Sequence, residues 1–207
     1  MAYFPFMIDI SNQNCLVVGG GNIAAHKVKL LSGFDVNIKV VGTEICRELS
    51  ALAGVEIVQR EFRDSDLDGM DFVVAATDDE KLNDYVSDLC RQRKILVNVV
   101  DRKESCSFIF PAMIQDKDML IAVSTGGQSP AAAAYVKRKI KSQIPEYYGE
   151  MIETLGNYRE YVLEHVDTAG ERKAIFEKLL EYGDSHNGEI EPETVKQIIA
   201  EVTSEIR

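Results

Sequence analysis

The chain carries a glycine-rich turn close to its start, at residues 19–24, which reads Gly-Gly-Gly-Asn-Ile-Ala. An apolar stretch, Asn14–Val18, precedes the turn, and an apolar helical pattern over Asn22–Leu31 follows it. This G-x-G-x-x-A pattern lets the backbone approach a pyrophosphate, whose charge is met by the helix N-terminus. The alternative is a tight turn without a ligand, but three consecutive glycines are costly unless something must approach closely. The turn therefore predicts a dinucleotide site that includes Gly19 and Gly21.

The first hundred residues alternate short apolar runs with helical patterns. Further strands are expected at Val36–Val41, Val55–Gln59, Asp71–Ala76 and Ile95–Val100, with helices at Thr43–Leu52 and Asp79–Arg93. Nearly continuous valine and isoleucine runs separated by helices are typical of a parallel sheet that is covered on both faces. The predicted fold class is α/β, a doubly wound (Rossmann) sheet.

The pattern changes after Asp101. Two strands, 107–114 and 119–124, are expected to form a hairpin, and Ser129 and Pro130 open a helix that runs to about Gln143. From residue 146 onward the pattern predicts three helices, which lie at Glu146–His165, Glu171–Tyr182 and Glu193–Ile206. We expect a nucleotide-binding domain over 1–113, a hairpin-helix dimerisation segment over 114–145 and an all-helical domain over 146–207.

The composition, with 45% hydrophobic and 28% charged residues, is ordinary for a soluble globular protein. The formal net charge of -11 disfavours nucleic acid and anionic membrane as partners, so neither is expected. Four cysteines without a C-x-x-C pair fit reduced thiols, and the three histidines lack metal-ligand spacing, so no resident metal is predicted. The N-terminus lacks a basic signal-peptide region, and a cytoplasmic location is expected.

Polar residues follow three of the predicted parallel strands, at the sheet edge where such folds bind ligands. After the second strand, Glu44 is the acidic candidate that favours NAD over NADP, although it could also be a first-turn helix carboxylate. After the fourth strand comes Thr77, with the alternative that Thr77 or Asp78 is only a helix N-cap. After the fifth strand comes Asp101, which can accept or steer a proton or only cap a loop.

Two further groups could bind anions. Arg102 and Lys103 follow Asp101 and are either a solvated face or ligands for substrate carboxylates. The segment 124–130, Ser-Thr-Gly-Gly-Gln-Ser-Pro, combines hydroxyls, glycines and a helix N-terminus, with basic residues beyond it on the same helix. It is either an anion cradle that includes Ser124, Thr125 and Gly126, or a plain strand-to-helix turn.

Together these motifs resemble the precorrin-2 dehydrogenase and sirohydrochlorin ferrochelatase family of sirohaem synthesis. The motifs run in the family's order over residues 3 to 145: Tyr3–Pro5, Val18–Ala24, Ala75–Asp79, Asn98–Asp101, Ser107–Ala112 and Ser124–Pro130. The resemblance implies NAD-dependent oxidation of precorrin-2 to sirohydrochlorin by a homodimer. Some members also insert Fe²⁺, which would add a lyase activity.

The resemblance also implies roles for individual residues. In the family, the aspartate of the Asn-Val-Val-Asp motif is implicated in both reactions, and here that residue is Asp101. The family's NAD-holding positions map onto Asn22, Ile23, Thr43 and Glu44. Because precorrin-2 carries many carboxylates, an acidic protein must gather cations at its cleft, and the candidates are Arg102, Lys103, Lys137 and Arg138. The alternative function is a non-catalytic NAD-binding or tetrapyrrole-carrier protein, because the catalytic argument depends on one aspartate.

Overall fold

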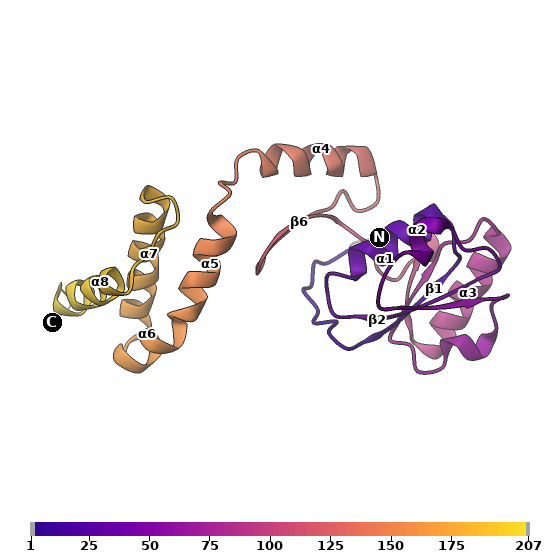
Figure 1. Cartoon of the computed structure of the whole chain (residues 1–207), viewed down its shortest axis with the longest axis horizontal. Coiled ribbons are helices and arrows are strands. Elements are labelled where there is room, and N and C mark those ends of the chain that lie inside the picture. The colour runs from indigo at the N-terminus through magenta and orange to yellow at the C-terminus, as the bar shows by residue number, and fades with distance from the viewer. Residues whose placement is uncertain (1–2, 206–207) are drawn as a thin grey trace. The chain divides into compact units, whose positions relative to one another are not determined.

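A computed structural model describes residues 3–205 of the chain. The chain divides between Phe110 and Pro111 into two compact units. The first unit contains the glycine turn and every strand that the sequence predicts to be parallel. The second contains a hairpin, the helix that follows it and a group of C-terminal helices (Figure 1).

The first unit is built on a five-stranded parallel sheet. The strands are β1 (Asn14–Val18), β2 (Asn37–Gly42), β3 (Val55–Gln59), β4 (Phe72–Ala75) and β5 (Leu96–Val99). Their spatial order is β3-β2-β1-β4-β5, so the connection from β3 to β4 crosses back over β2 and β1. This order confirms the doubly wound prediction, and the strand bounds agree with the sequence pattern to within one residue.

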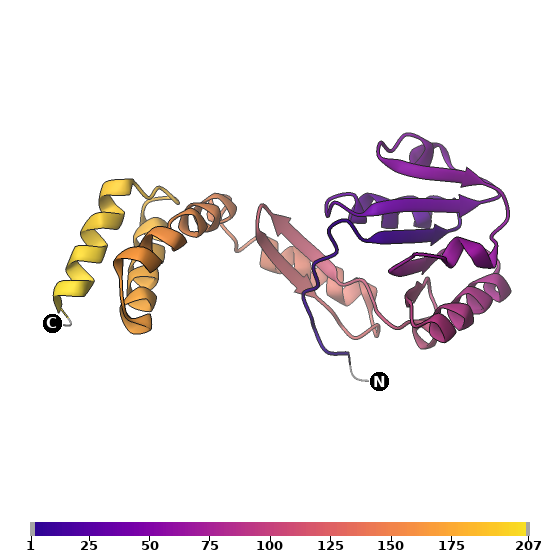
Figure 2. The same cartoon turned by 90° about the horizontal axis from the view of Figure 1, so that it is seen from below.

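Both faces of the sheet are covered by helices. Alternate side chains of β1, such as Cys15 and Val17, pack with Ala24 and Val28 of helix α1 (Asn22–Leu31). The intervening side chains pack with Val86 and Cys90 of helix α3 (Glu80–Arg93) on the other face. In Figure 2, α3 is the magenta helix alongside the strands of the sheet. This two-sided burial is the reason why the central strands β1 and β4 carry nearly continuous apolar runs.

Two of the four cysteines lie fully buried in the core of the first unit. Cys15 and Cys90 are fully buried, and burial raises the pKa of their thiols to about 12 and about 11 respectively. A thiol that stays protonated at neutral pH is a poor nucleophile. Both residues therefore serve as small core side chains.

The helix expected over Thr43–Leu52 is much shorter than predicted. Helix α2 covers only Arg47–Ser50, and Thr43 is not its N-cap. The backbone before α2 passes directly beside the glycine turn, where the Cys46 amide donates a 2.8 Å hydrogen bond to the Gly20 carbonyl. This tertiary contact holds residues 43–46 outside the helix, and no local propensity signals it.

The N-cap of α3 also differs from the prediction. Asp79, not Thr77 or Asp78, caps the helix, because its carboxylate accepts from the amides of Lys81 and Leu82. The side chain of Thr77 is thereby left for other contacts.

The second unit begins with an antiparallel hairpin of β6 (Ala112–Asp116) and β7 (Met119–Val123), followed by helix α4 (Pro130–Lys141). Ser129 caps α4 by accepting from the Ala132 amide, as predicted. The sequence predicts that the first hairpin strand starts at residue 107, but β6 starts only at Ala112. Phe108 and Phe110 instead pack on the parallel sheet, where the Phe108 ring meets the Phe72 ring edge-on at 6.2 Å.

Four helices complete the second unit: α5 (Tyr148–Asn157), α6 (Arg159–His165), α7 (Ala169–Ser185) and α8 (Pro192–Glu205). The single helix predicted over 146–165 is interrupted at Tyr158, just after Gly156, a residue of low helix propensity. A capping box formed by Thr168 and Glu171 opens α7. Residue 206, the predicted end of the last helix, lies outside the described residues. Within residues 3–205, none of the helices has the length and apolar character needed to cross a membrane.

A buried ion pair fixes the connection between β3 and β4. The Asp66 carboxylate is 3% exposed and accepts two bonds from the Arg60 guanidinium, at 2.6 and 2.7 Å, and one from the Arg63 amide at 2.9 Å. The hydrogen bonds from Arg60, joined by that from the Arg63 amide, hold the pKa of Asp66 below its ordinary value. The charged carboxylate is therefore bound more favourably in the folded chain than in the unfolded one.

We predict that Asp66→Asn destabilises the protein at neutral pH and flattens its acid unfolding. Because the folded pKa is lowered, the stabilisation is present above the unfolded value of about 3.9 and is lost as the pH falls through the folded value. Urea unfolding between pH 7 and pH 2 measures this dependence. Asp68→Asn is the matched control, since Asp68 pairs with Arg93 at 2.8 Å but is 72% exposed. Equal pH profiles for wild type and Asp66→Asn would contradict the prediction.

Candidate active site

The glycine turn between β1 and α1 is held against two neighbouring loops by direct backbone contact. Gly19 has a φ of +116°, and a Cβ there would overlap the carbonyl oxygen of Ala76, just after β4. A Cβ on Gly20 would overlap the carbonyl oxygen of Glu44, just after β2. Glycine is therefore required at both positions by the protein itself.

Gly21 differs from the two glycines before it. A Cβ at Gly21 would meet nothing within 4 Å, and its φ of -81° is accessible to any residue. Gly21 is the N-cap of α1, and no side chain caps the first turn of this helix. The first amides of α1 therefore face open space at the carboxyl edge of the sheet, which suits an anionic group such as a pyrophosphate. This arrangement fits a dinucleotide, with the predicted residues Asn22 and Ile23 in the first turn.

The loop after β2 places Thr43 and Glu44 next to the glycine turn. Both side chains are exposed, and the Thr43 carbonyl accepts a 3.1 Å hydrogen bond from the Gln59 side chain. Although Glu44 follows the strand by two residues, the contact of its carbonyl with Gly20 brings it to the turn. Its carboxylate is therefore available at the position where this fold class reads the ribose.

The loop after β4 is organised by a small polar network. The Thr77 hydroxyl donates to the Asn83 side chain at 2.8 Å, and the Asn83 amide group donates to the Thr77 carbonyl at the same distance. Asn83 is buried, so this pair fixes the loop against the first turns of α3. The Thr77 amide nitrogen lies beside Gly19, and the Thr77 side chain is occupied within the protein, so its role in cofactor binding stays a prediction.

The turn that carries Asp101 follows β5 and is pinned by two buried groups. The Asn98 side chain donates to the Phe108 carbonyl at 3.0 Å. The Cys106 sulfur accepts from the Val99 amide at 3.1 Å and lies 3.3 Å from the Arg102 carbonyl. These contacts explain why an asparagine stands in an otherwise apolar strand, and they give Asn98 and Cys106 structural roles.

Asp101 itself is exposed and has a φ of +58°, in the left-handed region that aspartate and asparagine tolerate better than most residues. Its carboxylate acts electrostatically on the Lys27 ammonium, which reaches this edge from α1. The Lys27 nitrogen lies 4.3 Å from the centre of the Phe110 ring. Sequence analysis missed Lys27, although a lysine three residues after Ala24 and four before Leu31 falls on the buried stripe of the helix.

Arg102 is surrounded by carboxylates. Its guanidinium pairs with Glu80 at 3.3 Å, with Asp84 at 3.2 Å and with Glu104 at 3.1 Å. These ion pairs connect the turn that carries Asp101 to the start of α3. They also neutralise the positive charge of Arg102, which the sequence had suggested for binding substrate carboxylates. The assignment of Arg102 to the substrate therefore stays a prediction, and one for which this arrangement gives no support.

The remaining predicted residues belong to the second unit. Ser124 accepts from the Gly126 amide at 3.1 Å, and the Thr125 hydroxyl exchanges two 3.0 Å hydrogen bonds with the backbone of Ser129. Gly126 has a φ of +60°. Arg138 and Lys139 of α4 lie over the Tyr135 ring. The segment 124–130 is thus a turn held together by its own hydrogen bonds, and its role in substrate binding stays a prediction.

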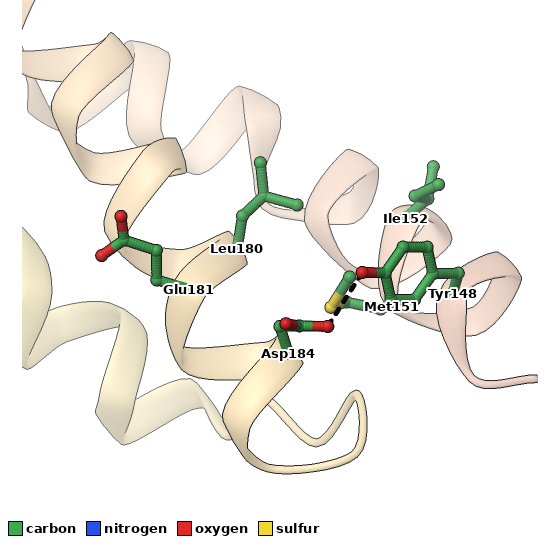
Figure 3. Close-up of a pocket in the computed structure, with 6 residues that line it drawn as sticks. All are labelled: Tyr148, Met151, Ile152, Leu180, Glu181 and Asp184. Atoms are coloured by element: carbon green, nitrogen blue, oxygen red, sulfur yellow. Dashed lines mark hydrogen bonds between the residues drawn. The ribbon is translucent and has the colours of Figure 1, made fainter. Parts of the chain in front are cut away.

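A hollow of about 310 Å³ lies among the C-terminal helices, and its lining includes none of the predicted site residues (Figure 3). Six residues line it: Tyr148, Met151, Ile152, Leu180, Glu181 and Asp184. The Asp184 carboxylate accepts from both Tyr147 and Tyr148 at 2.9 Å, so its charge is already bound. Among residues 3–205, His, Cys, Asp and Glu nowhere gather as three or more potential metal ligands.

The strand order, the glycine turn and the uncapped α1 define a dinucleotide-binding protein of the Rossmann class. Comparison with known proteins agrees. Residues 6–112 match a family described as "Putative NAD(P)-binding", and residues 116–143 match one described as "Sirohaem biosynthesis protein central". The chain belongs to this NAD(P)-binding family, in the group that includes siroheme synthases.

Two relatives illustrate the similarity. The siroheme synthase of Thioalkalivibrio sulfidiphilus is 42% identical over 184 residues, which are 87% of this chain and 38% of that protein. The siroheme synthase of Pseudomonas fluorescens is 38% identical over 87% of this chain and 40% of its own length. The chain thus spans about two fifths of the length of these curated relatives.

A solved structure shares the fold. The precorrin-2 dehydrogenase SirC superimposes with a TM-score of 0.72 over 98% of this chain and 100% of its own. At 22% identity this likeness bears on the fold alone.

We predict that Gly20→Ala and Gly21→Ala have different effects. The new methyl group at residue 20 meets backbone, which cannot move aside, so this variant should lose about 1–3 kcal/mol of unfolding free energy. The methyl group at residue 21 meets open space, so this variant should fold normally but bind the dinucleotide more weakly. Urea unfolding and isothermal titration with NAD measure the two effects. Equal destabilisation of both variants would contradict the prediction.

Proposed function

We propose that this protein oxidises precorrin-2 to sirohydrochlorin with NAD as the electron acceptor, in sirohaem biosynthesis. The proposal rests on two groups that lie together at the carboxyl edge of the sheet. An uncapped helix N-terminus suited to a pyrophosphate and an exposed carboxylate, Asp101, both stand at the carboxyl ends of the same five parallel strands. The family membership and the siroheme synthase relatives support the substrate.

The preference for NAD over NADP is part of the proposal. Glu44 is exposed beside the glycine turn, and a carboxylate there accepts hydrogen bonds from ribose hydroxyls and repels a 2′-phosphate. Arg47, the nearest arginine in the sequence, opens helix α2 three residues later. The loop therefore offers the chemistry of an NAD site.

The roles of the chain's own residues follow from their placement. The first amides of α1 hold the pyrophosphate, and Gly21 keeps the approach to them open. When bound, the nicotinamide supplies the hydride acceptor. The Asp101 carboxylate accepts the proton that leaves the tetrapyrrole as the hydride departs, so that oxidation removes two electrons and two hydrogens in all. The pinned turn around Asn98 and Cys106 holds Asp101 in place for this step.

Three further expectations stay predictions. Insertion of Fe²⁺ would use the same Asp101, with the iron as a substrate, since the macrocycle supplies the nitrogens. A homodimer through 114–145 is favoured by the half-exposed apolar residues of β6 and β7 and by Tyr135, which is 52% exposed. A cytoplasmic location is consistent with four free cysteines.

We predict that Asp101→Asn abolishes most of the dehydrogenase activity without affecting the fold. Loss of a general base typically lowers kcat by about 10²–10⁴-fold. Asparagine keeps the shape and tolerates the positive φ, whereas alanine would add backbone strain. Anaerobic assays of precorrin-2 with NAD, followed by NADH absorbance, measure the rate. If wild type binds sirohydrochlorin but forms no NADH, the carrier function is correct instead; full activity of Asp101→Asn would remove Asp101 from the mechanism.

We predict that Glu44→Gln narrows the discrimination between NAD and NADP. The neutral side chain no longer repels a 2′-phosphate, so affinity for NADP should rise while affinity for NAD falls by several-fold. Titration of each variant with both dinucleotides measures the ratio. Glu48→Gln is the matched control, because Glu48 is an exposed carboxylate one turn further on, inside α2. An unchanged ratio in Glu44→Gln would contradict the NAD assignment.

A further inference from the structure

Lys27 is a charged residue on the buried stripe of α1. It lies on the helix face that carries Ala24 and Leu31, both of which pack in the core beneath the sheet edge. Its side chain is half-buried, and its nitrogen lies over the Phe110 ring at 4.3 Å. Burial, partly opposed by the charge of Asp101, lowers the pKa of the ammonium. The chain thus holds a partly dehydrated cation where an alanine or leucine would pack more easily.

The contacts of Lys27 leave its hydrogen-bonding capacity unused. In the part of the chain that the structure describes, its one specific contact is the Phe110 ring, and no carboxylate pairs with it. An ammonium has three donors, and placing such a group in a half-buried position without an acceptor costs free energy. The aromatic face offsets part of this cost but accepts none of the three hydrogen bonds in the usual sense.

The specific contact of Lys27 lies in the segment after β5 and not in the first turn of α1, where the pyrophosphate is expected. Lys27 itself is five residues past the start of the helix, about 7.5 Å along the helix axis. The side chain instead extends toward the segment after β5, where Asp101 and Phe110 lie. An anion that binds Lys27 is therefore expected to be part of the same ligand that contacts Asp101.

We propose that Lys27 is a substrate-binding residue, whose ammonium binds a peripheral carboxylate of the tetrapyrrole while Asp101 faces the carbon that is oxidised. This inference rests on the proposed function. It assigns to α1 the cation that the sequence had sought at Arg102, which is already paired with Glu80, Asp84 and Glu104. The ammonium of Lys27 would pair with a carboxylate on the rim of the ligand ring, and the carboxylate of Asp101 would accept a proton from the ring.

The test is binding of sirohydrochlorin, the reaction product, by the full chain without turnover. Lys27→Met removes the charge but keeps an unbranched stem to pack on Phe110. We expect it to raise the dissociation constant for sirohydrochlorin and the KM for precorrin-2 by about 10- to 100-fold, as for loss of one charge-assisted hydrogen bond. Affinity for NAD should stay as in wild type. Lys27→Arg, which restores a cation, should recover part of the loss.

Lys29→Met is the matched control, because Lys29 lies in the last turn of the same helix and is exposed. It removes the same charge from the protein and should bind sirohydrochlorin as wild type does. If Lys27→Met also binds as wild type, the inference is overturned while the proposed function stands. Loss of NAD binding in Lys27→Met would likewise overturn it, by assigning Lys27 to the cofactor. Failure of wild type to bind sirohydrochlorin would overturn both.

Discussion

The approach of the glycine turn to two neighbouring loops is the contact on which the site depends. Gly19 lies against the backbone after β4, and Gly20 lies against the backbone after β2. Because no side chain separates them, three chain segments converge within van der Waals distance at the carboxyl edge of the sheet. This convergence brings Glu44 to the turn, delays the start of α2 and leaves the first amides of α1 facing outward.

The turn after β5 supplies a carboxylate, that of Asp101, which can accept a proton; the glycine turn has no such group. Asn98 is a motif residue, yet the structure uses both Asn98 and Cys106 to hold the backbone, through bonds to Phe108 and Val99. Asp101 is exposed in this turn, in a backbone conformation that suits it. The division of labour has a physical basis, since a buried amide or thiol needs partners within the protein whereas an exposed carboxylate does not.

Charge is distributed unevenly over this edge. The protein carries a net charge of -11, and three carboxylates surround Arg102. A polyanionic substrate would be repelled unless individual cations were kept apart from this acidic excess. Lys27 meets that condition, because an aromatic ring rather than a carboxylate occupies its one specific contact among the described residues.

The sequence by itself determined the parallel sheet, the glycine turn, the hairpin and the capped start of α4. These features depend on local patterns, such as continuous apolar runs and Ser129 before Pro130, that the chain carries within a few residues. Tertiary structure decided the short α2, the packing of Phe108 on the first sheet, the neutralised Arg102 and the position of Lys27. Each depends on a contact between segments far apart in the chain, and the energy of such a contact is not encoded in the local sequence.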